Sequence, residues 1–284
     1  MCYGSSEGDK SCRLQWVAGA RMSTRPQESA HNDARWQKLL TEGHRPLRIA
    51  HLLFRHMRSP PRCKVCYNPF GGIGGKLVGL AGFSRSRKNP NLCARCCDTL
   101  PPGGAEIDIA VLFADVRGST ALGEHLEPSA YAALMNRFYR AATEVLVRHD
   151  AIIDKLIGDA VMALFIPGIC GPQYRRRAVE AALALLDTIG PGRSDAPQLP
   201  IGAAVNSGLT YVGNVGSEGV VDFTALGDTV NTTAHLASSA AAGEVLLSET
   251  VYAAVAERFP SLERRTLTLR SKGAAVAVRV ARLR

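Results

Sequence analysis

The chain of 284 residues has no long hydrophobic run, and aromatic residues make up only 6% of it. A helix that crosses a membrane needs about 18 or more consecutive apolar residues, so the sequence argues against a membrane span. No basic stretch followed by a short apolar stretch marks a secretory signal peptide. We therefore expect a cytoplasmic protein.

Acidic residues are scarce in the first third of the chain. Residues 1–104 carry a net charge of +11, whereas residues 105–284 carry −2. Such asymmetry is typical of contact with nucleic acid or an anionic membrane surface. The basic segment has neither aromatic residues interleaved with its cations nor a known nucleic-acid motif. A solvated basic face is therefore favoured, with nucleic-acid or membrane contact as the alternative.

Cysteines, in contrast, are abundant in one segment: five of the eight lie between residues 63 and 97. They include two Cys-x-x-Cys pairs separated by 26 residues. In a cytosolic chain this pattern favours a metal site over disulfides. The predicted ligands are Cys63, Cys66, Cys93 and Cys96. Zinc is favoured, an iron–sulfur cluster stays open because Cys97 is a spare ligand, and unligated thiols are the third possibility.

The sequence divides into four segments. Residues 1–28 are polar and aperiodic, so we expect disorder there, and Met22 is an alternative start. Residues 29–100 combine two short amphipathic helices (29–58) with the cysteine-rich segment. The glycine-rich stretch 71–75 departs from the phosphate-loop pattern and is predicted to be a flexible loop. Residues 101–104 form a Pro-Gly linker to the fourth and largest segment, a domain at 105–284.

Strands and helices are mixed in the segment after the linker, which predicts an α+β fold with a mixed or antiparallel sheet and flanking helices. Helices are expected at 128–148, 173–189, 228–241 and 248–257. Strands are expected at 107–114, 152–157, 160–166, 199–206, 209–215, 220–225 and 245–247, followed by a hairpin within 262–282.

Two acids occupy turns that follow apolar strands. Asp115 ends a strand that is apolar enough to be buried on both faces, and Asp159 lies at the tip of the hairpin 152–165. Each alone has an ordinary explanation, as a helix cap or a turn residue. If the hairpin lies beside the first strand, the two carboxylates converge near the turn 116–120, whose backbone N–H groups are suited to phosphate. Such a pair is typical of a two-Mg²⁺ site for phosphoryl transfer.

Three blocks, FADVRGST, KLIGDAVMALF and ALGDTVN, resemble the signature blocks of the class III adenylate/guanylate cyclase catalytic domain, and the resemblance covers about residues 105–284. It implies a ferredoxin-like α+β core, preceded here by the helical, metal-ribbon-like cysteine module. It also implies a homodimer with active sites at its interface and two Mg²⁺ or Mn²⁺ ions in each site.

The resemblance also implies roles for individual residues. Asp115, Asp159 and the carbonyl of Val116 match the metal ligands, and Gly118, Ser119 and Thr120 the phosphate-binding turn. Lys155 and Thr224 match the purine-reading positions, where an ammonium that donates to adenine N1 and a hydroxyl that accepts from the exocyclic amine favour ATP over GTP. Asn231 matches the residue that orients the ribose. Lys272 matches the phosphate-contacting lysine, with Arg270 as a substitute.

His235 is the main departure from the family pattern, which has an arginine there. Histidine is shorter, is only partly protonated near neutral pH and lacks a bidentate fork. The predicted function is an adenylate cyclase that forms cyclic AMP and pyrophosphate from ATP in intracellular signalling. The alternative is a catalytically degenerate relative that binds nucleotide or regulates a partner.

Overall fold

The computed structural model describes residues 26–43, 45–56, 61–86, 91–99, 103–190, 198–217, 220–269 and 274–283. Among these residues, no helix is long and apolar enough to cross a membrane. Several predictions fall outside them: the disorder of residues 1–25, the start at Met22, and the roles of Lys272 and Arg270. The side chain of Cys97 is also outside the described part.

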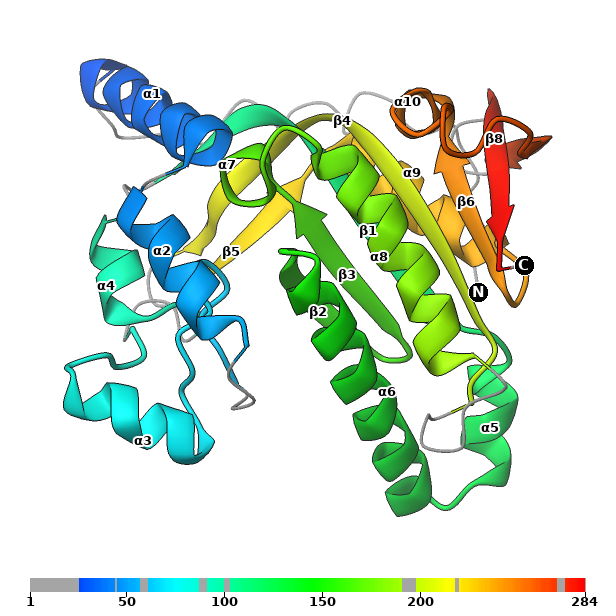
Figure 1. Ribbon diagram of the computed structural model, residues 1–284, viewed down its shortest axis with the longest axis horizontal. Helices are drawn as coiled ribbons and strands as arrows, with labels where there is room; N and C mark the ends of the chain where they lie inside the picture. Colours follow the sequence, from blue (N-terminus) through cyan, green and yellow to red (C-terminus); the bar gives the residue numbers. More distant parts are fainter. Residues whose placement is uncertain are drawn as a thin grey trace, which may run out of the picture.

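The part after the linker is built on one eight-stranded sheet (Figure 1). Its strand order is β2-β3-β1-β4-β6-β8-β7, and β5 pairs with β4 beside this path. Every pairing is antiparallel except that of β4 with β6. The strands are β1 (Gly104–Val116), β2 (Ile152–Ile157), β3 (Ala160–Phe165), β4 (Ile201–Ser217), β5 (Val220–Leu226), β6 (Glu244–Ser248), β7 (Glu263–Leu269) and β8 (Ala274–Arg282). The predicted α+β class is confirmed.

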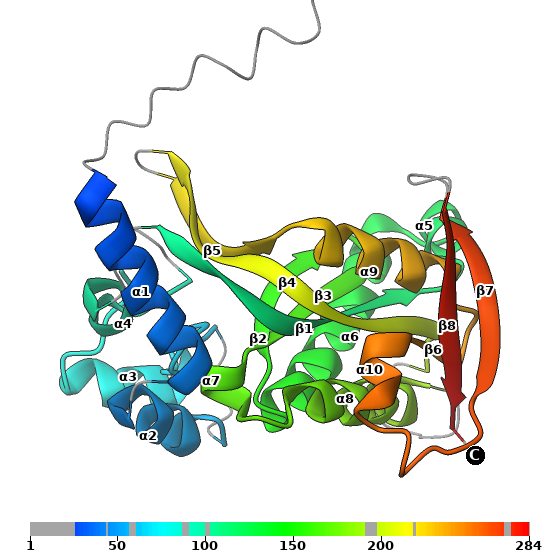
Figure 2. The same ribbon diagram turned by 90° about the horizontal axis from the view of Figure 1, so that it is seen from above.

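Helices cover both faces of this sheet (Figure 2). One face carries α6 (Pro128–Arg148), α8 (Tyr174–Ile189) and the short α10 (Glu249–Ala253), and the other carries α9 (Asp228–Ser239). The predicted helix 128–148 has the bounds of α6, whose buried stripe includes Met135, Phe138 and Leu146. Two further short helices, α5 (Ser119–His125) and α7 (Pro167–Cys170), were not predicted.

Strand β1 lies at the centre and is buried on both faces, as its apolar run predicts. Ala110, Leu112 and Ala114 pack into the core under α6 and α8. The alternate residues Ile109, Val111 and Phe113 pack into the opposite core. Glu106 and Asp108 near the start of β1 are exposed, but from Ile109 to Ala114 the strand has no solvent face, and this segment therefore holds the residues that end the strand rigidly.

The predicted pair of strands at 199–206 and 209–215 is wrong, because β4 runs unbroken from Ile201 to Ser217. Its polar centre, Asn206–Gly208, resembles a turn in the sequence. In the structure the antiparallel ladder with β1 continues through it, pairing Val111 with Asn206 and Ala110 with Ser207. The Asn206 side chain is satisfied locally, because its Nδ2 donates to the Thr229 carbonyl at 3.3 Å.

The glycine-rich stretch is also different from its prediction, because it forms helix α3 (Gly72–Leu80) and not a flexible loop. Glycine is needed here for close packing. A Cβ on Gly75 would lie 2.6 Å from the carbonyl carbon of Phe70. The Gly75 N–H donates to the Gly71 carbonyl at 2.9 Å, which starts the helical hydrogen bonding.

The N-terminal part consists of α1 (Pro26–Glu42), α2 (Arg45–Phe54), α3 and α4 (Ala94–Thr99) around the four cysteines. Helix α1 includes residues 26–28, which were predicted to be disordered. We call residues 61–99 the cysteine module. Trp36 of α1 is fully buried and stacks on Phe223 of β5 with ring centroids 6.0 Å apart. The N-terminal part therefore shares one apolar core with the sheet.

Candidate active site and cysteine cluster

The two candidate metal ligands meet at one end of the central strand. Asp115 ends the β1–β3 ladder, opposite Ala160, and Asp159 precedes Ala160 at the hairpin tip. The Val116 N–H donates to the Asp159 carbonyl at 3.1 Å. The Ser119 hydroxyl donates to the Asp159 carboxylate. The hairpin thus lies beside β1 in the way that the hypothesis of converging carboxylates requires.

The turn after Asp115 depends on a glycine. Gly118 has φ 74°, in the left-handed region that favours glycine, and it precedes the first residue of α5. Ser119 and Thr120 begin that helix. Their proposed contacts with phosphate, like a metal contact of the Val116 carbonyl, stay predictions.

The environment of Asp115 suits a divalent cation. Burial raises the pKa of its carboxyl to about 6; Arg117 opposes this shift, and nearby Asp159 reinforces it. Its Oδ1 is buried without a hydrogen-bond partner. Two close carboxylates with an unsatisfied buried oxygen form an oxygen donor set of the kind that Mg²⁺ and Mn²⁺ prefer.

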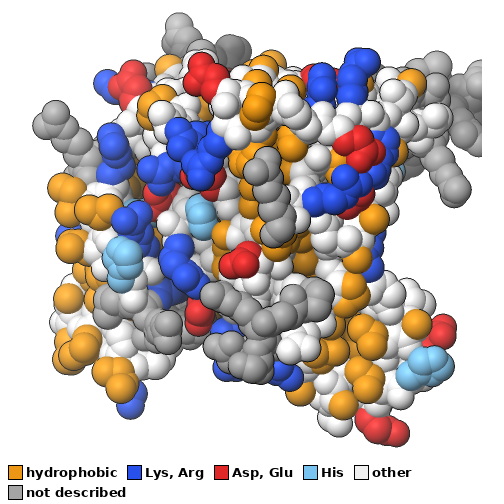
Figure 3. Space-filling view, turned by 45° about the vertical axis from the view of Figure 1, so that its right-hand side comes forward, with side chains coloured by type: hydrophobic (Ala, Val, Ile, Leu, Met, Phe, Trp, Pro, Cys, Tyr) orange, Lys and Arg blue, Asp and Glu red, His pale blue; other side chains and the backbone are white. Residues whose placement is uncertain are grey.

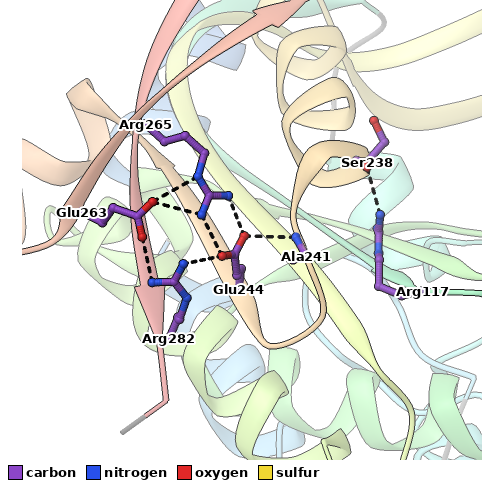
Figure 4. Close-up of polar contacts among 7 residues, drawn as sticks. All are labelled: Arg117, Ser238, Ala241, Glu244, Glu263, Arg265 and Arg282. Atoms are coloured by element: carbon purple, nitrogen blue, oxygen red, sulfur yellow. Dashed lines mark hydrogen bonds and ion pairs between the residues drawn. The ribbon is translucent and has the colours of Figure 1, made fainter.

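Arg117 is a residue that the sequence reasoning missed. Its guanidinium pairs with Asp115 Oδ2 at 2.8 Å. It also donates to the Ser238 carbonyl at 3.0 Å, a contact drawn in Figure 4. It therefore links the acidic end of β1 to the C-terminal turn of α9. Its position two residues after Asp115 was the available signal, but its partner on α9 lies more than one hundred residues away.

The two candidate purine-reading residues lie on β2 and β5. Lys155 is exposed, whereas Thr224 is only 3% exposed. The Thr224 hydroxyl donates to Asp154 Oδ2 at 2.8 Å. Asp154 is 4% exposed and was also missed by the sequence reasoning. A β-bulge between Ile153 and Lys155 surrounds it.

Asn231 and His235 lie on α9, where the spacing of four places them on one face of the helix. Both are exposed. The His235 carbonyl accepts the hydroxyls of Ser238 and Ser239. Among the described residues, no hydrogen bond or ion pair joins Asp115 or Asp159 to any of Lys155, Thr224, Asn231 and His235.

The four predicted cysteine ligands are brought together. Their Sγ atoms lie within 4.8 Å of one another, and those of Cys66 and Cys93 are 3.6 Å apart. All four are buried and free of disulfides. The Cys96 N–H donates to Cys93 Sγ at 3.4 Å. Four converging thiols in two Cys-x-x-Cys turns form a donor set that suits a metal ion.

A search against known protein families matches residues 105–280 to the adenylate and guanylate cyclase catalytic domain. Similar curated proteins include uncharacterized protein Rv1319c of Mycobacterium tuberculosis, 33% identical over 156 residues, in a match that covers 54% of this chain and 28% of the relative. Uncharacterized protein Rv1318c of the same organism is 31% identical over 157 residues, with 55% and 28% covered. The chain thus spans less than a third of the length of these relatives.

Two solved structures resemble the same part of the chain. The adenylyl cyclase CyaB from P. aeruginosa has 26% sequence identity and a TM-score of 0.53, with 63% of this chain and 96% of that chain covered. The guanylyl cyclase Cya2 has 26% identity and a TM-score of 0.54, with 63% and 93% covered. Because the family model matches more than half of the sequence, this chain belongs to the family of adenylate and guanylate cyclase catalytic domains.

Proposed function

We propose that this chain is a nucleotide cyclase that converts ATP to cyclic AMP and pyrophosphate. The observation that carries the proposal is the pair Asp115 and Asp159 at the end of β1, with Asp115 Oδ1 buried and unpartnered. Bound Mg²⁺ or Mn²⁺ supplies Lewis-acid stabilisation of the nucleophile and the phosphates. The ribose O3′ loses its proton and bonds to the α-phosphorus, while the bond from that phosphorus to the leaving pyrophosphate breaks.

In this proposal the two carboxylates hold the cations, and the hydrogen bond from Ser119 fixes the orientation of Asp159. Arg117 is paired with Asp115 and is placed to balance negative charge at the same end of β1. Asn231 orients the ribose from the exposed face of α9, and Lys272 contacts the phosphates.

The preference for adenine rests on Lys155 and Thr224. An ammonium donates to adenine N1, whereas guanine carries a hydrogen on that nitrogen. The Thr224 hydroxyl donates to Asp154, so its oxygen retains lone pairs that accept from the adenine amino group. Guanine presents a carbonyl at that position, which is an acceptor and matches this arrangement poorly.

The proposed enzyme is a homodimer in which each site combines residues of two copies. Asp115 and Asp159 come from one copy, and Lys155, Thr224, Asn231 and His235 come from the other. Exposed apolar residues beside the purine-reading residues support an interface there. Leu156 and Ile157, next to Lys155, are 46% and 49% exposed, and Leu226, two residues after Thr224, is 46% exposed. Apolar side chains exposed together in this way are typical of surfaces that another chain covers.

His235 favours a second candidate function, a degenerate cyclase that binds nucleotide without turnover. Its exposed ring stands where the family has an arginine, and a neutral imidazole stabilises phosphate charge less well. We favour the active enzyme because both aspartates, Lys155 and Asn231 are present and Arg117 adds a guanidinium beside the metal ligands.

For the cysteine cluster we propose zinc. A tetrahedral ion with Zn–S bonds of about 2.3 Å separates its sulfurs by about 3.8 Å. The Cys66–Cys93 Sγ separation of 3.6 Å is close to this value. A cluster of several irons would hold the ligand sulfurs farther apart. None of these four cysteines forms a disulfide, which supports the cytoplasmic location that we propose.

The test is an assay of the purified chain with Mg²⁺ or Mn²⁺ and either ATP or GTP, with cyclic products measured by mass spectrometry. We expect cyclic AMP from ATP, and loss of product in Asp115→Asn. The absence of any cyclic product from wild type contradicts the enzyme proposal. Product that appears only in His235→Arg supports the degenerate alternative.

A further inference from the structure

Lys64, inside the first Cys-x-x-Cys turn, contacts the catalytic part at the purine-reading strands. Its Nζ lies 3.1 Å from Asp222 Oδ1 and 3.7 Å from Asp154 Oδ1, and it donates to the Phe223 carbonyl at 3.3 Å. Its side chain is 10% exposed, and that of Asp154 is 0% exposed. Solvent screens a cation at this depth only weakly, so its attraction to the carboxylates beside it is stronger than at the surface.

Asp154 in turn sets the orientation of the Thr224 hydroxyl. An ionised carboxylate only accepts hydrogen bonds, so Thr224 must donate to it. Burial raises the pKa of Asp154, and Lys64 opposes that rise. Asp154 Oδ1 has no hydrogen-bond partner, which leaves the ammonium of Lys64 as the nearest countercharge to that oxygen in the described structure.

The two cysteine turns act on these strands together. The Lys64 N–H donates to the Asn91 carbonyl at 2.9 Å, which joins the first turn to the segment before the second. The Asn91 amide donates to Asp222 Oδ1 at 3.1 Å. A cavity of 310 Å³ lies between the module and β2, and Lys64, Asn91, Asp154 and Lys155 are among its lining residues. Lys155 thus lies in a space whose other wall is the cysteine module.

We propose that the cysteine module sets the nucleobase selectivity of the cyclase, with Lys64 as the positioning residue that keeps Asp154 as acceptor and the Thr224 oxygen available to adenine. The proposal rests on the proposed function for the identity of the purine-reading residues. A metal held by Cys63 and Cys66 fixes the turn that carries Lys64. Loss of that metal therefore releases Lys64. Without Lys64, Asp154 is no longer held as the acceptor and Thr224 is no longer held as its donor.

The sequence offers a matched control, because Arg95 occupies the second Cys-x-x-Cys turn as Lys64 occupies the first. Arg95 is exposed, and its guanidinium lies over the Phe83 ring within the module, 4.9 Å from the centroid. Lys64→Met and Arg95→Met each remove one cation from a Cys-x-x-Cys turn, Lys64 from the position after the first cysteine and Arg95 from the position before the second. Only the first removes a cation from the purine-reading strands, and Lys64→Arg restores the charge.

The experiment measures binding of 3′-deoxy-ATP and 3′-deoxy-GTP to the full chain in Mn²⁺. These analogues lack the attacking hydroxyl, so the measurement does not depend on turnover. We expect Lys64→Met to lower the preference for the adenine analogue about tenfold. This is the size expected when one buried hydrogen bond, that from the adenine amino group to the Thr224 oxygen, is lost. Arg95→Met and Lys64→Arg should retain the wild-type preference. Metal content of the cysteine cluster, measured by elemental analysis, should be unchanged in all three variants.

A second measurement tests the coupling between the cysteine-bound metal and the nucleobase preference. Removing the cysteine-bound metal and restoring Mn²⁺ should lower the adenine preference of wild type and speed amide exchange in β5. An unchanged preference in Lys64→Met with intact metal, or a wild type that does not distinguish the two analogues, overturns the proposal. If wild type forms no cyclic product but its adenine preference depends on Lys64, the proposed function fails and this inference stands.

Discussion

Glu244 gives a prediction whose size follows from the structure. It is 5% exposed at the start of β6. Its carboxylate accepts from Arg265 at 2.8 and 2.9 Å, from Arg282 at 2.6 Å and from the Ala241 N–H at 3.1 Å (Figure 4). These contacts, chiefly that with Arg265, lower its pKa from 4.5 to about 2. The network ties the segment after α9 to β7 and β8.

The lowered pKa of Glu244 contributes to the unfolding free energy, because the folded and unfolded states bind the proton with different affinities. A difference of about 2.5 pKa units corresponds to about 3 kcal/mol of unfolding free energy. Because the folded pKa is the lower one, this stabilisation is complete above pH 4.5 and is lost as the pH falls toward 2. Glu244→Gln should therefore destabilise the protein by up to about 3 kcal/mol at pH 7 and by progressively less in acid.

Urea unfolding of wild type and Glu244→Gln, followed by circular dichroism from pH 7 to pH 3, measures this difference. Glu263→Gln is the control, because Glu263 belongs to the same network but its side chain is 46% exposed. Its charges are screened by solvent, and we expect a small effect. A difference between wild type and Glu244→Gln that is the same at every pH would refute the reasoning.

Three further changes test other parts of the account. His235→Arg should raise turnover about tenfold or more, because a guanidinium stabilises phosphate charge better than imidazole. An unchanged or lower kcat would argue that the residue at this position does not stabilise the phosphates. Asp159→Asn should lower cyclase activity about a hundredfold and weaken Mn²⁺ binding by calorimetry; equal Mn²⁺ affinity would remove Asp159 from the metal site. Gly168→Ala would place a Cβ 2.5 Å from the Leu39 carbonyl oxygen of α1 and should loosen that helix. We expect faster proteolysis and a loss of about 1–3 kcal/mol in unfolding free energy. The control Gly123→Ala should be neutral, because its Cβ would lie 3.8 Å from the nearest atom.

The pattern of apolar residues predicts the central strand and the long helices because each of them packs an apolar run or stripe into the core. The run 107–114 lies within β1, and Pro128 begins α6 as predicted. Asp115 and Asp159 were placed together by assuming that the hairpin lies beside β1, which the ladder confirms. The cysteine cluster followed from ligand spacing alone.

Tertiary context decided the features that the sequence did not predict. The polar centre of β4 remains a strand because β1 pairs with it on one side, and no local pattern reports that ladder. Helix α3 depends on close packing of Gly75 against Phe70. Asp154 and Lys64 are 90 positions apart in the sequence, so their ion pair is visible only in the fold.

The apolar side chains of α3 are largely exposed, which the local sequence pattern does not predict. Ile73, Leu77 and Leu80 are 80%, 60% and 89% exposed, and apolar side chains lie at the surface at the lower left of Figure 3. On the face shown there, acidic and basic side chains are interspersed.

The central claim is that each active site combines the aspartates of one copy with the purine-reading residues of another. Mixing two inactive variants, Asp115→Asn and Lys155→Ala, and measuring cyclic AMP formation tests it most directly. Half of the dimers are then mixed and each has one intact site, so the mixture should recover about a quarter of wild-type activity. A mixture that stays inactive, although both variants are folded and dimeric by size-exclusion chromatography, would contradict the claim.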